Sequence, residues 1–215
     1  MSHHDPLIGM NLGRYELREA LRATPTGQVY LAYHAPTQLF VELKVVLDDV
    51  SVPAKTRERL ERELQTLTRI NHPNVIRLWA VGREGAMSYV VMEHVDGRTL
   101  SSWLAELGRL RWRDALRLFH YVLRGLEAVH SFGMIHRDVS LDNILLGRDG
   151  RVVVGDFSSV KMIGVDGTTT STFHSKEMLS NRYAAPEQLA GEAVDARTDL
   201  YSAGMCLYHC VAAGL

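Results

Sequence analysis

The sequence predicts an α+β chain of two parts, a small antiparallel sheet with one helix followed by a mainly helical region. Residues 15–46 contain three segments rich in aromatic and β-branched side chains, broken by proline and glycine, which is typical of antiparallel strands. From residue 113 onward, apolar side chains recur at helical spacing. We therefore expect one domain over residues 1–95 and a second over 96–215, which meet at a turn formed by Asp96 and Gly97.

The first part is predicted to hold five strands and a charged amphipathic helix. The helix begins at Pro53, runs to about Ile70 and carries Leu60, Leu64 and Leu67 on one face. The predicted strands are Tyr15–Leu21, Gln28–Tyr33, Leu39–Val46, Ile76–Val81 and Met87–Glu93.

The second part is predicted to contain two long helices separated by a short hairpin. The first helix, Arg113–Ser131, carries its apolar face on Leu116, Phe119, Leu123, Leu126 and His130. The hairpin pairs Ile144–Leu146 with Val152–Val154 around a turn at Asp149 and Gly150. A polar stretch over 164–181 reads as a loop, and an apolar helix follows over Ala196–Ala213.

Composition and charge narrow the class of protein. The chain has 215 residues, of which 46% are apolar and 23% charged, and its net charge of −1 argues against a protein built to hold nucleic acid. A cluster of arginines within residues 109–124 is interrupted by acidic residues and is expected to be a solvated helix face. Cys206 and Cys210 lie one helical turn apart in an apolar segment, so we expect two buried thiols without a disulfide.

Neither a signal peptide nor a membrane-spanning segment is apparent in the sequence. The start lacks a basic region followed by an apolar one, and no apolar run reaches the roughly 18 residues that a transmembrane helix needs. We expect the chain to be cytoplasmic.

The stretch from His136 to Asn143 carries the clearest chemical signal. It places the carboxylate of Asp138 and the carboxamide of Asn143 five residues apart in a short loop, directly before an apolar run. Such a pair suits phosphoryl transfer, in which one group accepts a hydroxyl proton and the other holds a metal ion.

Six landmarks in order make the chain similar to the bacterial eukaryotic-like (Hanks-type) Ser/Thr protein kinases, over Tyr15–Gly214. The landmarks are Lys44 at the end of a strand, Glu63 on the charged helix, the segments 136–143 and 155–158, the triplet Ala185–Glu187, and Asp199–Gly204 at the start of the last helix. The resemblance implies the bilobal protein-kinase fold, with ATP and Mg²⁺ as cofactors and a protein hydroxyl as substrate. The Ala185–Glu187 triplet favours a protein substrate because related small-molecule kinases lack it.

The resemblance also assigns roles to individual residues. Lys44 would hold the α- and β-phosphates, and Glu63 would pair with Lys44. Asp138 would be the base that orients the substrate hydroxyl, while Asn143 and Asp156 would hold Mg²⁺. For the adenine ring, the resemblance implies contacts from Val29 and Leu145 on its two faces, Met92 at the back, and the backbone groups of Glu93 and Val95.

The phosphate-covering loop departs from the family pattern. Only Gly27 remains of three glycines, and Arg22 and Thr24 stand where the other two would be. Their side chains hinder close approach of the backbone to phosphate, and Pro25 removes an N–H donor. We expect weaker nucleotide binding.

Three further departures fall at or near the candidate catalytic residues. Glu42 replaces the small residue that packs on the adenine, and Ser140 replaces the usual lysine two residues after Asp138. Ser158 replaces a glycine after Asp156 and Phe157. Because side chains alternate along a strand, Glu42 shares a face with Lys44 and is expected to pair with it, unless a local shift of the strand turns Glu42 outward.

Two expectations concern the segments around the Ala185–Glu187 triplet. A phosphate on one of Thr168–Thr172 would pair with Arg137, and Ser180 would reach the catalytic aspartate. The family's further helices do not follow Leu215, so Glu187 would lack its arginine partner. A second copy of the chain or a further domain would then cover the exposed side of the last helix.

The leading hypothesis is a Ser/Thr protein kinase. A pseudokinase that binds or scaffolds with little or no turnover is the alternative, supported by Glu42, the degraded loop and the absence of the family's further helices from this sequence. A small-molecule kinase is a third reading.

Overall fold

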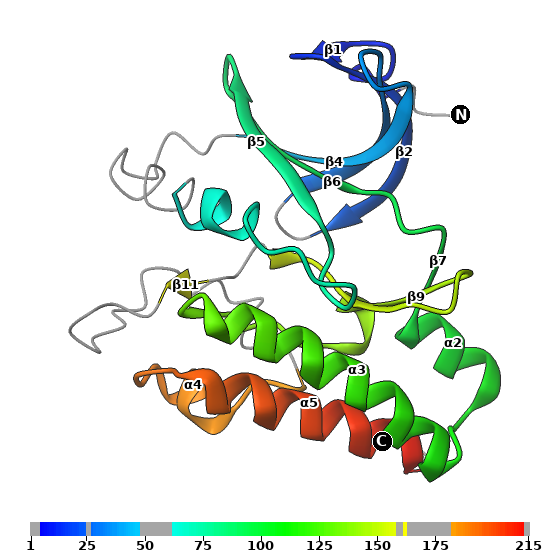
Figure 1. The fold of residues 1–215 in the computed structure, drawn as a ribbon, viewed down its shortest axis with the longest axis vertical. Coiled ribbons are helices and arrows are strands. Elements are labelled where there is room, and N and C mark those ends of the chain that lie inside the picture. Colours follow the sequence, from blue (N-terminus) through cyan, green and yellow to red (C-terminus); the bar gives the residue numbers. More distant parts are fainter. Residues whose placement is uncertain (1–4, 25–26, 48–61, 158–160, 163–181, 213–215) are drawn as a thin grey trace. The chain divides into compact units, whose positions relative to one another are not determined.

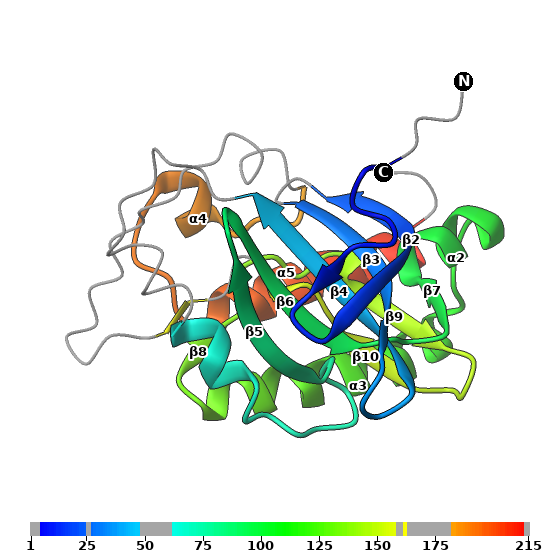
Figure 2. The same ribbon diagram turned by 90° about the horizontal axis from the view of Figure 1, so that it is seen from above.

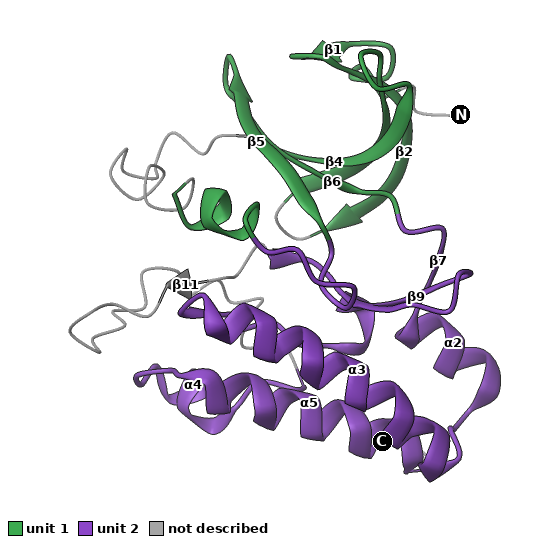
Figure 3. Cartoon of the chain, in the orientation of Figure 1, with its two compact units in different colours: residues 1–69, 77–94 green, residues 70–76, 95–215 purple. Residues whose placement is uncertain are grey.

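The structure is a computed structural model that describes residues 5–24, 27–47, 62–157, 161–162 and 182–212. The chain divides into two compact units, the first formed by residues 1–69 and 77–94 and the second by 70–76 and 95–215 (Figure 3). The short segment 70–76 belongs to the second unit because its backbone is hydrogen-bonded there. The N–H of Val154 donates to the backbone oxygen of Asn74 at 2.9 Å, and the N–H of Ile76 donates to that of Val154 at 2.9 Å. The two-domain expectation had placed this stretch in the first part.

The first unit is built on one antiparallel sheet of six strands. The strand order is β1-β2-β3-β4-β6-β5, and the central strands lie side by side in Figure 2. The strands are β1 (Asn11–Leu12), β2 (Tyr15–Thr24), β3 (Gly27–His34), β4 (Leu39–Leu47), β5 (Leu78–Glu84) and β6 (Met87–Glu93).

The alternation of side chains along the strands explains how the sheet forms an apolar core. In β4 the alternate residues Val41, Leu43 and Val45 are buried, and they pack in a core with Leu17 and Val91. The five predicted strands are confirmed, with boundaries that move by up to three residues; β1 was not predicted. Residues 62–67 are helical and bury Leu64 and Leu67, as predicted, whereas Pro53 and Leu60 lie outside the described residues.

Glu42 is buried in β4, and its expected pairing with Lys44 is wrong. Its carboxylate accepts hydrogen bonds from Arg22 Nη2 at 2.7 Å and from His94 Nδ1 at 3.1 Å. Within the part of the chain that the structure describes, these two are its ion-pair partners. The reason is cross-strand placement: Glu42 stands opposite Leu31 of β3 and Met92 of β6, from where it reaches the ends of β2 and β6.

The second unit contains four helices among the described residues, together with short strand pairs (Figure 1). Its core combines apolar side chains from α3, α5 and the β9–β10 hairpin. The elements are β7 (Gly97–Thr99), α2 (Leu100–Leu107), α3 (Trp112–Ser131), β8 (Met134–Ile135), η1 (Leu141–Asn143), β9 (Ile144–Gly147), β10 (Val152–Val154), β11 (Lys161–Met162), α4 (Pro186–Ala190) and α5 (Ala196–Val211).

Two local predictions for this unit were wrong. Leu116 and Leu123 are exposed, because α3 buries the neighbouring stripe with the smaller residues Ala115 and Gly125, which allow close packing. Gly97 does not form a turn with Asp96 but begins β7, where a side chain would collide with the backbone of β9.

Other predictions for the second unit are confirmed. The arginines of residues 109–124 are exposed, and Cys206 and Cys210 are buried free thiols. Burial raises the pKa of Cys210 to about 11 and that of Cys206 further, so both thiols stay protonated.

Among the described residues, no helix is both long and apolar enough to cross a membrane.

Gly125 and Gly204, two helical glycines, should respond oppositely to alanine. A Cβ at Gly125 in α3 would collide with the backbone oxygen of Asn74, so Gly125→Ala should lower the free energy of unfolding by about 2–3 kcal/mol. A Cβ at Gly204 in α5 meets nothing, so Gly204→Ala should raise it by up to about 1 kcal/mol. Chemical denaturation measures both, and equal effects would contradict the close packing of α3 at residue 125.

Arg22→Ala and Glu42→Gln should differ in cost, because only one of them leaves a buried charge behind. The Glu42 side chain is 5% exposed and the Arg22 side chain 44%. Arg22→Ala should therefore destabilise by about 2–3 kcal/mol, and Glu42→Gln by less, since Arg22 can then be hydrated. Adding Glu42→Gln to Arg22→Ala should recover stability in denaturant titrations. A double variant no more stable than Arg22→Ala would show that Glu42 does not depend on this partner.

Candidate active site

The loop before β9 brings together Asp138 and Asn143, two of the three predicted catalytic residues of the second unit; the third, Ser140, lies in the same loop. Asn143, the last residue of η1, donates from Nδ2 to the backbone oxygen of Asp138 at 2.8 Å and to its Oδ2 at 3.1 Å. The amide group of Asn143 thus fixes the carboxylate of Asp138. The carbonyl oxygen of Asn143 is the part of this side chain that suits a metal ion.

Two residues at or near the candidate site have a strained backbone conformation. Three non-glycine residues in the described part of the chain have a positive φ: Gln38 in the turn before β4, Arg137 at +67° and Asp156 at +53°. Such residues cost on the order of 1–3 kcal/mol each and persist only where their surroundings hold them. Of these, Arg137 directly precedes Asp138, and Asp156 is itself a candidate metal ligand.

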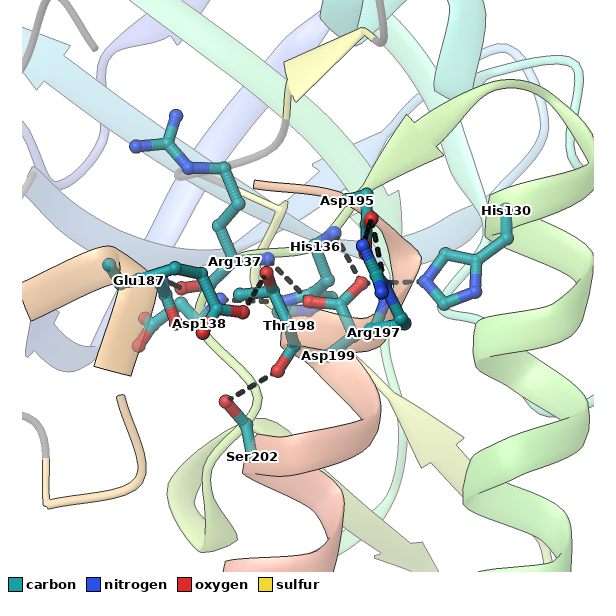
Figure 4. A network of polar contacts seen from close by, with 11 residues as sticks. His130, His136, Arg137, Asp138, Glu187, Asp195, Arg197, Thr198, Asp199 and Ser202 are labelled. Carbon is teal, nitrogen blue, oxygen red and sulfur yellow. Dashed lines mark hydrogen bonds and ion pairs between the residues drawn. The ribbon is translucent and has the colours of Figure 1, made fainter. Parts of the chain in front are cut away.

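Asp199 holds the strained loop from the first turn of α5. Its side chain is 0% exposed, and it accepts the backbone N–H groups of His136 and Arg137, both at 2.8 Å (Figure 4). A third donor is Nε2 of His130 on α3, at 2.7 Å. Charge-assisted bonds of this kind are about twice as strong as neutral ones, which accounts for a charged group at this depth.

His136 links the loop to the turn that carries Asp156. Its buried ring contacts the oxygen of Gly155 through Nε2 at 2.9 Å, and Asp138 N–H donates to its Nδ1 at 3.2 Å. The neutral ring with its proton on Nε2 satisfies both contacts. The ring also packs against Phe157, with centroids 4.7 Å apart.

The β9–β10 hairpin places both candidate metal ligands at one end. Ile144 pairs with Val154, and Gly155 N–H donates to the backbone oxygen of Asn143 at 2.8 Å. Asn143, before the first strand, and Asp156, after the second, therefore lie at the same open end of the hairpin. Among the described residues, no three His, Cys, Asp or Glu side chains form a metal site. Two oxygen ligands still fit Mg²⁺, which usually takes one or two protein side chains together with phosphate oxygens and water.

The Ala185–Glu187 triplet lies at the start of α4, and a hydroxyl group binds the carboxylate of Glu187 there. Thr198 of α5, which is buried, donates to its carboxylate at 2.6 Å. Just before the triplet, the hydroxyl of Tyr183 contacts His209 Nδ1 at 2.7 Å, and burial raises the pKa of this phenol, so it donates.

Gln188 is a residue of this network that sequence reasoning missed. Its Nε2 donates to the backbone oxygen of Arg137 at 2.8 Å, and its side-chain oxygen accepts Ala185 N–H at 3.1 Å. The only signal in the sequence is a glutamine at the third position of a helix, which is common in helix capping. That signal does not reveal a contact with a loop 51 residues away.

The candidate residues of the first unit occupy its sheet and helix. Lys44 in β4 and Glu63 in the helix are 5% and 6% exposed, and charged residues are rarely buried so deeply unless paired. Val29 and Met92 are buried in β3 and β6, and the N–H of Glu93 donates to Arg77 at 2.9 Å.

Gly27 has a structural reason to be glycine. A side chain there would collide with the backbone oxygen of Val45 in β4, so the residue is required for strand packing whatever the loop binds. Val95, the first residue of the long segment 95–215 of the second unit, is buried, while Leu145 in β9 is half-buried. Ser140 is buried directly before η1.

Some predicted positions lie outside the described residues. They are Pro25, Ser158, Thr168–Thr172 and Ser180.

Comparison with known proteins gives one consistent family. The family model described as protein kinase domain matches residues 15–214. The probable serine/threonine-protein kinase CPE1738 of Clostridium perfringens is 36% identical over 206 residues, which is 95% of this chain and 30% of that protein. The serine/threonine-protein kinase PknA of Mycobacterium tuberculosis is 33% identical over 212 residues, which is 96% of this chain and 48% of that protein.

A solved structure agrees with these relatives. The PknI kinase domain of Mycobacterium tuberculosis, a C20A mutant, superposes with a TM-score of 0.77 at 26% identity, covering 96% of this chain and 76% of that one. The chain thus spans from 30% to about half the length of the curated relatives it matches. With the family model matching nearly its whole length, the chain belongs to the protein kinase domain family, among relatives named as bacterial Ser/Thr kinases.

Proposed function

We propose that this chain is the catalytic domain of a Ser/Thr protein kinase, which transfers the γ-phosphoryl group of ATP to protein hydroxyls with Mg²⁺. The observation that carries the proposal is the pairing of Asp138 with Asn143 on a strained loop, held by the buried carboxylate of Asp199. Phosphoryl transfer depends almost entirely on positioning and charge stabilisation, and this arrangement supplies positioning.

Asp138 is the proposed base. With one carboxylate oxygen held by Asn143 at 3.1 Å, the plane of the carboxylate is fixed. A fixed carboxylate can orient the substrate hydroxyl and accept its proton as the phosphoryl group departs. Ser140, where the family has a lysine, supplies no positive charge, so we expect a lower rate rather than a different chemistry.

Asn143 and Asp156 are the proposed Mg²⁺ ligands. The amide nitrogen of Asn143 is bound to Asp138, which turns its carbonyl oxygen to the metal role, and Asp156 offers a carboxylate from the same hairpin end. When bound, Mg²⁺ would neutralise charge on the phosphates and fix their orientation.

The residues of the first unit are proposed to hold the nucleotide. Lys44, positioned by Glu63, would bind the α- and β-phosphates as a point charge. The adenine would contact Val29, Leu145 and Met92, with hydrogen bonds to the carbonyl of Glu93 and the N–H of Val95. Gly27 would lie next to the phosphates.

The contacts of Glu42 bear on the pseudokinase alternative. One of the three grounds for that reading was that Glu42 would draw Lys44 away from the phosphates; the degraded loop and the missing helices were the others. In the structure, Arg22 and His94 bind the carboxylate of Glu42 instead. We therefore favour catalysis over scaffolding alone.

The proposed partner is a protein substrate in the cytoplasm. Apolar side chains remain exposed on α4 and α5, and a second copy of the chain or a further domain is proposed to cover them. These residues are Leu189, Leu200, Tyr201 and Tyr208.

Asp138→Asn should abolish transfer but not nucleotide binding. We expect phosphate incorporation into casein from γ-labelled ATP to fall on the order of 10³-fold, because the general base is removed. The thermal shift with Mg-ATP should be retained; at about 100 times the dissociation constant it corresponds to about 2.7 kcal/mol.

Asp149→Asn is the matched control, since Asp149 lies exposed in the β9–β10 turn. It should keep the parent's activity. A parent chain that shows no shift at millimolar Mg-ATP, or an Asp138→Asn variant as active as the parent, would contradict the proposal.

A further inference from the structure

Gln188 makes two hydrogen bonds of opposite kind from one side-chain amide. It stands third in α4, where its oxygen accepts the N–H of Ala185 at 3.1 Å. Its nitrogen donates to the backbone carbonyl of Arg137 at 2.8 Å. One bond closes the start of its own helix, while the other reaches the loop that carries Asp138.

The contact with Gln188 completes a set of bonds around Arg137. The N–H of Arg137 is bound by Asp199 at 2.8 Å and its carbonyl by Gln188. The next peptide N–H, that of Asp138, donates to His136 at 3.2 Å. Both peptide units that meet at the Cα of Arg137 are therefore held, on either side of a φ of +67° that an L-residue rarely adopts.

We propose that Gln188 is a positioning residue for catalysis: by binding the carbonyl of Arg137, it fixes the strained backbone and so sets the direction in which the side chain of Asp138 points. It acts through Arg137 and touches neither substrate nor cofactor. This inference rests on the proposed function of Asp138, and it couples the Ala185–Glu187 segment to the base.

The chemistry of the side chain explains why glutamine is required here. The site needs an acceptor toward Ala185 and a donor toward Arg137 at the end of one side chain. Glutamate supplies only acceptors and lysine only donors. Asparagine has the same amide but is one methylene shorter, so it would not span both partners.

The same complementarity gives a test. Gln188→Glu keeps the bond to Ala185 and sets an anionic oxygen against the carbonyl of Arg137. Gln188→Lys loses the bond to Ala185 and keeps a donor toward Arg137. If the contact with Arg137 positions the base, Gln188→Glu should lower kcat on the order of tenfold to a hundredfold with the KM for ATP within about twofold, and Gln188→Lys should be clearly more active than Gln188→Glu.

Glu192→Gln is the control for general disturbance around α4, because Glu192 lies exposed just after that helix. It should match the parent in kcat and KM. If Gln188→Glu were as active as Gln188→Lys or more so, the glutamine would serve only to cap α4, and the proposal would be wrong.

Hydrogen exchange separates this inference from the proposed function. The amide of Asp138 should exchange about tenfold faster in Gln188→Glu than in the parent, and nearly as slowly as the parent in Gln188→Lys. This result is independent of turnover, so a parent without kinase activity would refute the proposed function while leaving the positioning role supported. Unchanged exchange in Gln188→Glu would refute the positioning role itself.

Discussion

The buried carboxylate of Asp199 is the interaction on which the candidate site depends. A charge with no exposed surface is costly unless every oxygen is bound, and here two backbone N–H groups and the ring of His130 donate to it. Its position in the first turn of α5 adds to this, because the positive end of the helix dipole favours an anion. The start of one helix therefore holds a backbone conformation that would not persist alone.

The other parts of the site follow from that constraint. With the N–H groups of His136 and Arg137 held, the ring of His136 points to Gly155 and packs on Phe157. The loop is thereby joined to the turn that carries Asp156. On the other side, Glu187 is bound to Thr198, next to Asp199 in the same helix. The loop and Glu187 are thus bound directly to α5, and the turn with Asp156 is joined to α5 through His136.

The sequence predicted the elements and the chemistry better than it predicted polar partners. Aromatic and β-branched composition located β4 and β6, and the order of the landmarks identified the loop with Asp138 and Asn143. The apolar face of α3 was misassigned because leucines occur on more than one of its faces, and packing partners decide which face is buried.

The missed contacts all join residues distant in the chain. Glu42 binds Arg22 and His94, 20 and 52 residues away, and neither spacing is visible in a pattern of neighbours. For Glu187, Thr198 provides a hydroxyl where family resemblance suggested a missing arginine. Short-range sequence patterns predict the periodicity of a helix or strand and the position of a turn. Which side chains meet across strands or between helices depends on the folded chain.

The most direct measurement is amide hydrogen exchange at His136 and Arg137 in Asp199→Asn. Asparagine offers one oxygen where the carboxylate offered two, so at least one of these amides should exchange on the order of tenfold faster, in line with a cost of about 1–3 kcal/mol for an unsatisfied buried donor. Asp195→Asn, at the exposed N-cap of the same helix, should leave both amides unchanged. Full protection of both amides in Asp199→Asn would contradict the account, because the loop would then be held without this carboxylate.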